Sequence, residues 1–260
     1  MHVLEQKIAA ARAAGRRAII PFLTAGFPHP QEFWDHLQEI DQAGADIIEI
    51  GVPFSDPVAD GPVVEEASRR ALAYGTTLDD LLAELAVRHG RYKAALVLMG
   101  YYNPFYQYGL EKLARQAARA GISGFIVPDL PLEEADPMRK HLLANDIALI
   151  PLVGPNTSIE RMRLYAHKAT GYVYVVSVMG VTGERKTLTD AVGPTIKRAR
   201  QAFGIPIALG FGLRHPDQLA GLPETCTPDA AVIGSALLSH LDSGKHAAEF
   251  LAPWLKADRN

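Results

Sequence analysis

The sequence lacks the features that mark secreted, membrane and nucleic-acid-binding proteins. Its single cysteine, Cys226, cannot form a disulfide within the chain and suits a reducing compartment. No apolar run approaches the roughly 18 residues of a transmembrane helix, and the net charge of −3 comes without a basic stripe. The start of the chain carries Glu5 and lacks the apolar core of a signal peptide. These absences favour a cytoplasmic protein with a small-molecule ligand, and they argue against nucleic acid or a membrane as a partner.

Short apolar segments alternate with longer helical patterns eight times along the chain. The predicted strands span residues 18–23, 46–50, 94–99, 124–127, 148–152, 171–176, 207–209 and 230–233. The predicted helices span 30–43, 62–88 in one or two pieces, 109–120, 131–144, 157–169, 190–203, 215–220 and 235–256. Strict alternation indicates a parallel sheet, and eight units in 260 residues favour one closed (β/α)8 barrel domain over an open doubly wound sheet. An additional amphipathic N-terminal helix should turn Leu4 and Ile8 inward.

Active sites of such barrels lie on the loops that follow the C-terminal ends of the strands. The loop after the second strand, 52–61, is long, and residues 101–104 form a loop after the third. The loop after the sixth strand, 177–189, is rich in glycine and polar residues. It suits a mobile lid, although a plain surface excursion would have the same composition.

Two carboxylates lie near the end of the second strand. Ile47, Ile48 and Ile50 surround Glu49, so the strand should be buried on both faces and Glu49 should share a face with Ile47. Burial raises the pKa of a carboxyl group, whereas Asp60 on its loop should stay ionised more easily. The pair then has the character of a general acid and base, but taken alone Glu49 fits a paired structural acid and Asp60 a turn residue.

Glycine-bearing turns follow the last three strands. They contain Gly180 and Gly183, then Gly210 and Gly212, then Gly234 with Ser235 at the start of the last helix. Backbone N–H groups at such turns make a phosphate cradle, and this fold commonly places one after its seventh and eighth strands. Simple turns with Ser235 as a helix N-cap are the alternative. Four large side chains near the strand ends could pack in the core or line a pocket for a flat ligand: Phe22, Met99, Tyr174 and Phe211.

Two other routes to carbon–carbon chemistry lack their residues. No lysine lies at a C-terminal strand end, where a Schiff base would form. The nine histidines are scattered, without a pair at i, i+4 spacing, so no metal site is expected. The sequence therefore predicts chemistry that runs on acids and bases.

These motifs closely resemble the tryptophan synthase alpha subunit family over essentially the whole chain. The resemblance is carried by Phe22-Leu-Thr-Ala-Gly-Phe-Pro28, Ile48-Glu-Ile-Gly-Val-Pro-Phe-Ser-Asp-Pro-Val-Ala-Asp-Gly61, Gly180-Val-Thr-Gly183, Gly210-Phe-Gly212 and Gly234-Ser235. It implies a lyase that cleaves indole-3-glycerol phosphate to indole and glyceraldehyde 3-phosphate by a reverse aldol reaction. Met99, a position often held by Leu, and Val178-Met179 are mild departures.

The resemblance also implies a role for each motif residue. Glu49 would be the general acid and base, and Asp60 would bind the indole ring N–H. Thr182 would reach Asp60 when the lid closes. The implied indole-pocket residues are Phe22, Met99, Tyr174 and Phe211. The implied phosphate ligands are Gly183, Gly212, Gly234 and Ser235.

A partner follows from the same resemblance. The family docks on a beta subunit that carries pyridoxal phosphate (PLP), in an alpha2-beta2 heterotetramer, so this chain itself should need no cofactor. The matching contact positions are Pro53, Asp56, Asn103 and Pro104. Three alternatives remain: a noncatalytic phosphate-binding subunit, a free-standing indole-releasing lyase, and a related barrel synthase, which would want a lysine at a strand end.

Overall fold

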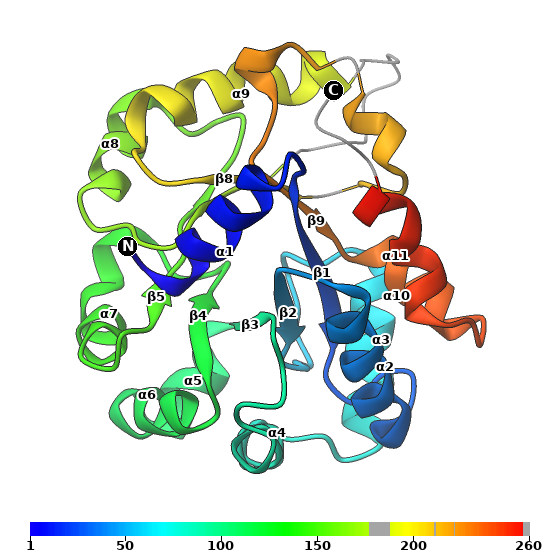
Figure 1. The fold of residues 1–260 in the computed structure, drawn as a ribbon. Coiled ribbons are helices and arrows are strands. Elements are labelled where there is room, and N and C mark those ends of the chain that lie inside the picture. Colours follow the sequence, from blue (N-terminus) through cyan, green and yellow to red (C-terminus); the bar gives the residue numbers. More distant parts are fainter. Residues whose placement is uncertain (177–187, 211, 221, 257–260) are drawn as a thin grey trace.

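The computed structural model describes residues 1–176, 188–210, 212–220 and 222–256, and its strands form one parallel sheet (Figure 1). The strands are β1 Ala18–Thr24, β2 Ile47–Gly51, β3 Ala95–Met99, β4 Ile122–Ile126, β5 Ala148–Leu149, β6 Leu152–Val153, β7 Val173–Val176, β8 Ile207–Gly210 and β9 Ala230–Ile233. Their order is β5-β4-β3-β2-β1-β9-β8-β7-β6. The predicted alternation of strands and helices is thereby confirmed, with parallel pairing throughout.

The sheet closes into a barrel through its fifth predicted strand, which is split into β5 and β6. Between the two pieces, the Ile150 N–H donates to the Phe125 carbonyl, and the Tyr174 N–H donates to the Pro151 carbonyl, both at 2.9 Å. One short segment thus bonds β4 on one side and β7 on the other. Pro151 has no N–H to donate, which accounts for the break in the ladder.

Helices surround the strands, and α1 lies across one end of the barrel (Figure 1). They are α1 Val3–Ala13, α2 Pro30–Ala43, α3 Pro62–Ala73, α4 Leu78–Val87, α5 Tyr102–Tyr108, α6 Leu110–Arg119, α7 Asp136–Leu143, α8 Ile159–Ala166, α9 Leu188–Ala202, α10 Ser235–Asp242 and α11 Ala247–Lys256. Three short 3-10 turns are η1 Leu132–Glu134, η2 Pro216–Leu219 and η3 Glu224–Cys226. No helix in the described part of the chain has the length and apolar character to cross a membrane.

The segment 62–88, predicted as one or two pieces, forms two helices, because Gly75 takes φ +82° and Thr77 caps α4 by accepting from the Asp80 N–H. Other predicted elements differ from the structure. The segment 235–256 is also two helices, with Gly244 at φ +74° between them. Residues 101–104, expected as a loop, lead into helix α5, and 215–220 contains only the 3-10 turn η2.

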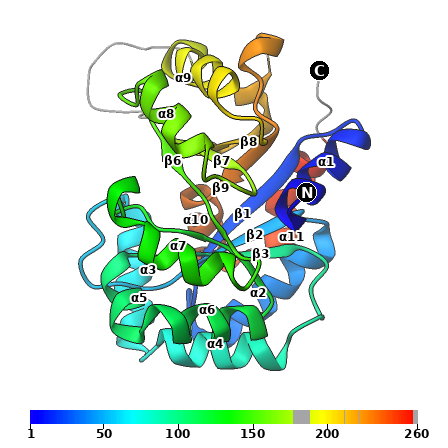
Figure 2. The same ribbon diagram turned by 90° about the vertical axis from the view of Figure 1, so that its left-hand side faces the viewer.

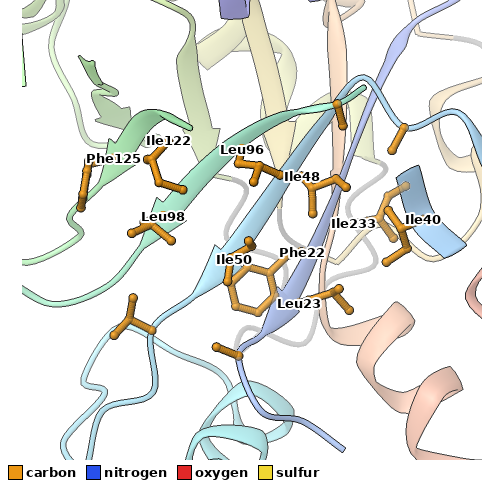
Figure 3. Close-up of a cluster of buried hydrophobic side chains, with 14 of the residues drawn as sticks. Phe22, Leu23, Ile40, Ile48, Ile50, Leu96, Leu98, Ile122, Phe125 and Ile233 are labelled. Carbon is orange, nitrogen blue, oxygen red and sulfur yellow. The ribbon is translucent and has the colours of Figure 1, made fainter. Parts of the chain in front are cut away.

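Alternation along the strands divides the core into two layers. Figure 3 shows the outer layer, in which Ile48, Ile50 and Leu98 on neighbouring strands pack with residues such as Ile40 of α2. Ile47, one residue before Ile48, belongs to the second cluster inside the barrel. Glu49 therefore projects from β2 toward the barrel interior together with Ile47, as the sequence predicts.

Helix α1 covers the end of the barrel at which the strands begin (Figure 2). Leu4 and Ile8 are buried in the inner cluster with Ala18, Ala95 and other residues from the strand starts. The predicted inward face of the N-terminal helix is confirmed. Access to the barrel interior is therefore from the opposite end, where the strands finish.

Candidate active site

Glu49 is a fully buried acid on the inner face of β2. Its Oε1 accepts a hydrogen bond of 2.7 Å from the Tyr172 hydroxyl, and its Oε2 has no hydrogen-bond partner among the described residues. Burial raises the pKa of Glu49 to about 8, and the bond from Tyr172 opposes that rise. Glu49 therefore carries a proton at neutral pH. Its hydrogen-bond donor among the described residues is a tyrosine and not a cation, which argues against a structural ion pair.

Asp60 ends the loop that joins β2 to α3. Burial raises its pKa to about 6, the hydrogen bond with Tyr101 lowers it, and the nearby Glu65 charge raises it. The Tyr101 hydroxyl also accepts from the Ala59 N–H at 2.9 Å, and its ring stacks on Phe54 at 5.2 Å between centroids. Asp60 is thus ionised at neutral pH while Glu49 is not, although its pKa is higher than that of an ordinary loop carboxylate.

Both acids open into one cavity at the C-terminal ends of the strands. The cavity holds about 580 Å3 of empty space, counting its open mouth. Its lining residues are Phe22, Glu49, Asp60, Gly61, Val64, Met99, Tyr174, Gly212, Val232, Gly234 and Ser235. An apolar wall with a few convergent polar groups is typical of a small-ligand site. Of the four large side chains expected to line a pocket, the structure brings Phe22, Met99 and Tyr174 together.

Two glycines leave room for aromatic rings that line the cavity. Gly51 on β2 lies beside Phe22 on β1, and Gly210 on β8 lies beside Tyr174 on β7. A Cβ added at Gly51 would lie 2.6 Å from the Cζ of Phe22, and one added at Gly210 would lie 2.0 Å from the hydroxyl oxygen of Tyr174. Neither ring could stand where it does beside a larger residue. The glycines at these two strand ends therefore set the shape of the cavity.

Three predicted phosphate-binding residues line the same cavity as the two acids. Gly212 has φ +78°, Gly234 is the N-cap of α10, and Ser235 is the first residue of that helix. The first N–H groups of a helix lack internal partners and lie at the positive end of its dipole, so this end can bind an anion. Gly234 rather than Ser235 occupies the N-cap position, which differs from the alternative in which Ser235 caps the helix.

Some predicted residues lie outside the described part of the chain. They are Thr182, Gly183 and Phe211, together with residues 177–187 of the expected lid. The last two residues of that predicted loop, 188 and 189, belong to α9. The roles expected of these positions stay predictions.

The expected partner contacts fall on two neighbouring segments, the loop 52–61 and helix α5. Asp56 and Asn103 are exposed, and Pro104 is half-buried. Pro53 is buried, so it shapes the loop instead of offering surface in the isolated chain. Val58, in the same loop, is 86% exposed and adds an apolar side chain to this surface.

Three functional neighbours were not predicted from the sequence. Tyr172 bonds Glu49, Tyr101 bonds Asp60, and Val64 of α3 lines the cavity. The inward position of Tyr172 could have been predicted, because it lies two residues before Tyr174 and alternation along a strand puts both side chains on the same face. The contacts of Tyr101 and Val64 depend on how the loop 52–61 folds back over the strands, and no local pattern encodes that path.

A second hollow, of about 770 Å3, lies near α7 and α8, away from both acids. Its three cations are paired: Arg139 and Lys168 with Asp136, and Arg161 with Glu133. Three cations and two carboxylates leave one positive charge, which Asp129 in the same lining offsets, so the hollow has no excess charge to attract a phosphate. The candidate active site is therefore the cavity that contains Glu49 and Asp60.

Comparisons with known proteins agree with this geometry. The family model described as tryptophan synthase alpha chain matches residues 8–256. The tryptophan synthase alpha chain of Desulfovibrio desulfuricans is 66% identical over 254 residues, covering 98% of this chain and all of that protein. That of Nitratidesulfovibrio vulgaris is 60% identical, with 96% and 97% covered. A crystal structure of tryptophan synthase subunit alpha from Legionella pneumophila is 31% identical, with a TM-score of 0.87 and 98% of each chain covered.

Proposed function

We propose a mechanism from the premise that the chain belongs to the tryptophan synthase alpha chain family and is a lyase that serves as the alpha subunit in tryptophan biosynthesis. The reaction is the reverse aldol cleavage of indole-3-glycerol phosphate to indole and glyceraldehyde 3-phosphate. One observation carries the proposal. Glu49 and Asp60 line the same cavity as Gly212, Gly234 and Ser235, so acids and a phosphate cradle can act on one ligand.

Glu49 acts first as an acid and then as a base. Because it is protonated at neutral pH, it can give its proton to the indole ring carbon that bears the side chain. The resulting carboxylate takes the proton of the adjacent hydroxyl group, the carbon–carbon bond breaks, and its electron pair restores the aromatic ring. The proton returns to Glu49, so the acid is regenerated in each turnover.

Asp60 supplies negative charge where positive charge develops. Ring protonation makes an indolenine cation, and an ionised Asp60 that accepts from the ring N–H would stabilise it in this partly buried site. Within the described ranges, no group of three or more His, Cys, Asp or Glu side chains could hold a metal ion.

The rest of the cavity binds and orients the substrate. We assign the indole ring to the apolar wall of Phe22, Met99 and Tyr174, with Phe211 as a further wall residue. We assign the phosphate to Gly212, Gly234 and Ser235, supported by their place at the N-terminus of α10. Gly183 as a phosphate ligand and Thr182 as a closing contact to Asp60 complete the proposal.

The family implies a beta subunit as partner. We propose an alpha2-beta2 assembly in which the beta subunit carries PLP and receives the indole, and we place the enzyme in the cytoplasm. The exposed residues Asp56 and Asn103, with Pro104 and the loop shaped by Pro53, are the proposed docking surface. The loop 52–61 contains Asp60, so a partner seated there would act directly on the site.

Indole release from indole-3-glycerol phosphate by the purified chain, with and without a tryptophan synthase beta subunit, tests this function. Slow release that the beta subunit accelerates is the expected result. Fast release that ignores the beta subunit would identify a free-standing lyase. No release in either condition, with the phosphate ligand still bound, would identify a noncatalytic binding subunit.

A further inference from the structure

A second, much smaller cavity lies behind Asp60. It sits under the loop 52–61 at the ends of β1, β2 and β3. Its empty volume is about 250 Å3, against about 580 Å3 for the main cavity, and the centre of a water-sized sphere can occupy about 10 Å3 of it. A buried site needs ~10–15 Å3 of such space to hold one water molecule. The lining residues are Phe22, Thr24, Gly51, Val52, Asp60, Val64, Ser68, Met99, Gly100 and Tyr101.

Four of the residues that line this small cavity have polar side chains. Thr24, the last residue of β1, is 1% exposed, and its hydroxyl has no hydrogen-bond partner in the part of the chain that the structure describes. Ser68, one turn after Val64 on α3, is 4% exposed. The Asp60 carboxyl and the Tyr101 ring with its hydroxyl complete the wall. Leaving a buried hydroxyl unbonded costs free energy, and a buried water typically needs two to four polar partners.

We propose that Thr24 and Ser68 bind one water molecule against the Asp60 carboxyl, and that the two hydroxyl residues are thereby positioning residues for Asp60. The water donates to the carboxylate from the side away from the main cavity. This leaves the opposite oxygen of Asp60 directed at the ligand. The consequence for turnover rests on the proposed function, whereas the binding of the water does not.

The groups around Asp60 show why a hydrogen-bond donor is needed at its carboxylate. The titratable groups that face it from the packed elements are Glu49 on β2, Glu65 on α3, Tyr101 after β3 and Tyr174 on β7. None of these described groups is a cation. Burial and Glu65 both favour the protonated acid, and Tyr101 opposes them. A water that donates to the carboxylate adds to the effect of Tyr101 and keeps Asp60 ionised at neutral pH.

The decisive variant is Thr24→Val, which removes the hydroxyl and keeps the shape of the side chain. We expect the acid limb of the kcat–pH profile to move upward by roughly one pH unit. At acidic pH this shift lowers kcat roughly tenfold, and at higher pH kcat recovers. Thr24→Ser keeps the hydroxyl and should restore the wild-type acid limb. Ser68→Ala should shift the limb in the same direction, and the double variant should shift it by less than the sum of the two.

The pKa of Asp60 can also be followed without turnover, by carbon-13 NMR of the aspartate-labelled chain. The proposal expects the same upward shift in Thr24→Val and Ser68→Ala. An unchanged Asp60 pKa in both variants, or a rate loss equal at every pH, would overturn it. If the wild-type chain releases no indole, the proposed function fails, but the NMR shift still decides whether the water site exists.

Discussion

At the scale of single residues, two carboxyl groups in one cavity have different proton affinities. Glu49 lies deep inside the barrel with one tyrosine as its donor, and its pKa rises to about 8. Asp60 lies at the edge of the same cavity, and its pKa rises only to about 6. Depth of burial separates the two values, since desolvation is the largest cause of both shifts. The separation gives one protonated acid and one carboxylate at neutral pH.

This separation predicts a bell-shaped dependence of kcat on pH. Turnover should rise as Asp60 loses its proton, through pH about 6 or lower when the proposed water donates to its carboxylate, and fall as Glu49 loses its own, through pH about 8. Steady-state indole release measured across this range checks both limbs.

Tyr172→Phe tests which limb belongs to Glu49. The variant removes a hydrogen bond that lowers the pKa of Glu49, so the alkaline limb should move to higher pH while the acid limb stays. A profile without an alkaline limb would contradict the role given to Glu49.

Glu49→Gln should remove turnover while the ligand still binds. The amide keeps the size of the side chain and can still accept from Tyr172, but it cannot deliver or accept the proton. A loss on the order of 10³-fold in kcat is expected, with the affinity for indole-3-glycerol phosphate retained by calorimetry.

Asp60→Asn is the matched comparison, and it should lower turnover with the phosphate end of the cavity unchanged. Rates like those of the wild type in either variant would reject the role assigned to that residue.

At the scale of elements, strand ends fix the shape of the cavity. Gly210→Ala places a methyl group where the Tyr174 hydroxyl lies, so the ring must move into the space proposed for indole. We expect a raised KM and a loss of about 1–3 kcal/mol of unfolding free energy. Chemical denaturation and steady-state kinetics measure both effects.

Gly204→Ala, in the turn before the same strand β8, is the control. An added Cβ there meets nothing within 4 Å, so stability and KM should change little. Equal effects of the two variants would show that the backbone, and not the contact with Tyr174, explains the need for glycine at position 210.

At the scale of the whole molecule, stability and catalysis lie at opposite ends of the barrel. Leu4 of α1 covers the strand starts, and its Cδ1 would be 3.0 Å from a Cβ added at Gly124 or Gly171. Leu4→Ala should lower the unfolding free energy by about 2–5 kcal/mol, because it empties a fully buried position.

Below the unfolding transition the same variant should keep the kcat and KM of the wild type. Val3→Ala, at a position 37% exposed, is the control and should cost much less. Denaturant titration gives the free energies, and a large change in kcat in folded Leu4→Ala would show that α1 also influences the site.

The sequence by itself determined the alternation of strands and helices, the burial of Glu49 and the inward face of α1. Periodicity reports these features because each depends on which face of one element meets the core. The break before Thr77 also has a local cause, because Thr77 caps α4 through the N–H of Asp80, three residues along. The helix over residues 102–108 was not predicted, and its first N–H is bound by the distant Asp129.

Only the tertiary structure decided how the site is assembled. Tyr172 reaches Glu49 across 123 positions of the sequence, and Asp60 meets Tyr101 because the loop 52–61 folds back over the strand ends. Barrel closure around Pro151 likewise depends on pairing with two distant strands. A sequence encodes the chemical character of each residue locally, but pKa values and cavities arise from groups that meet only when the barrel has closed.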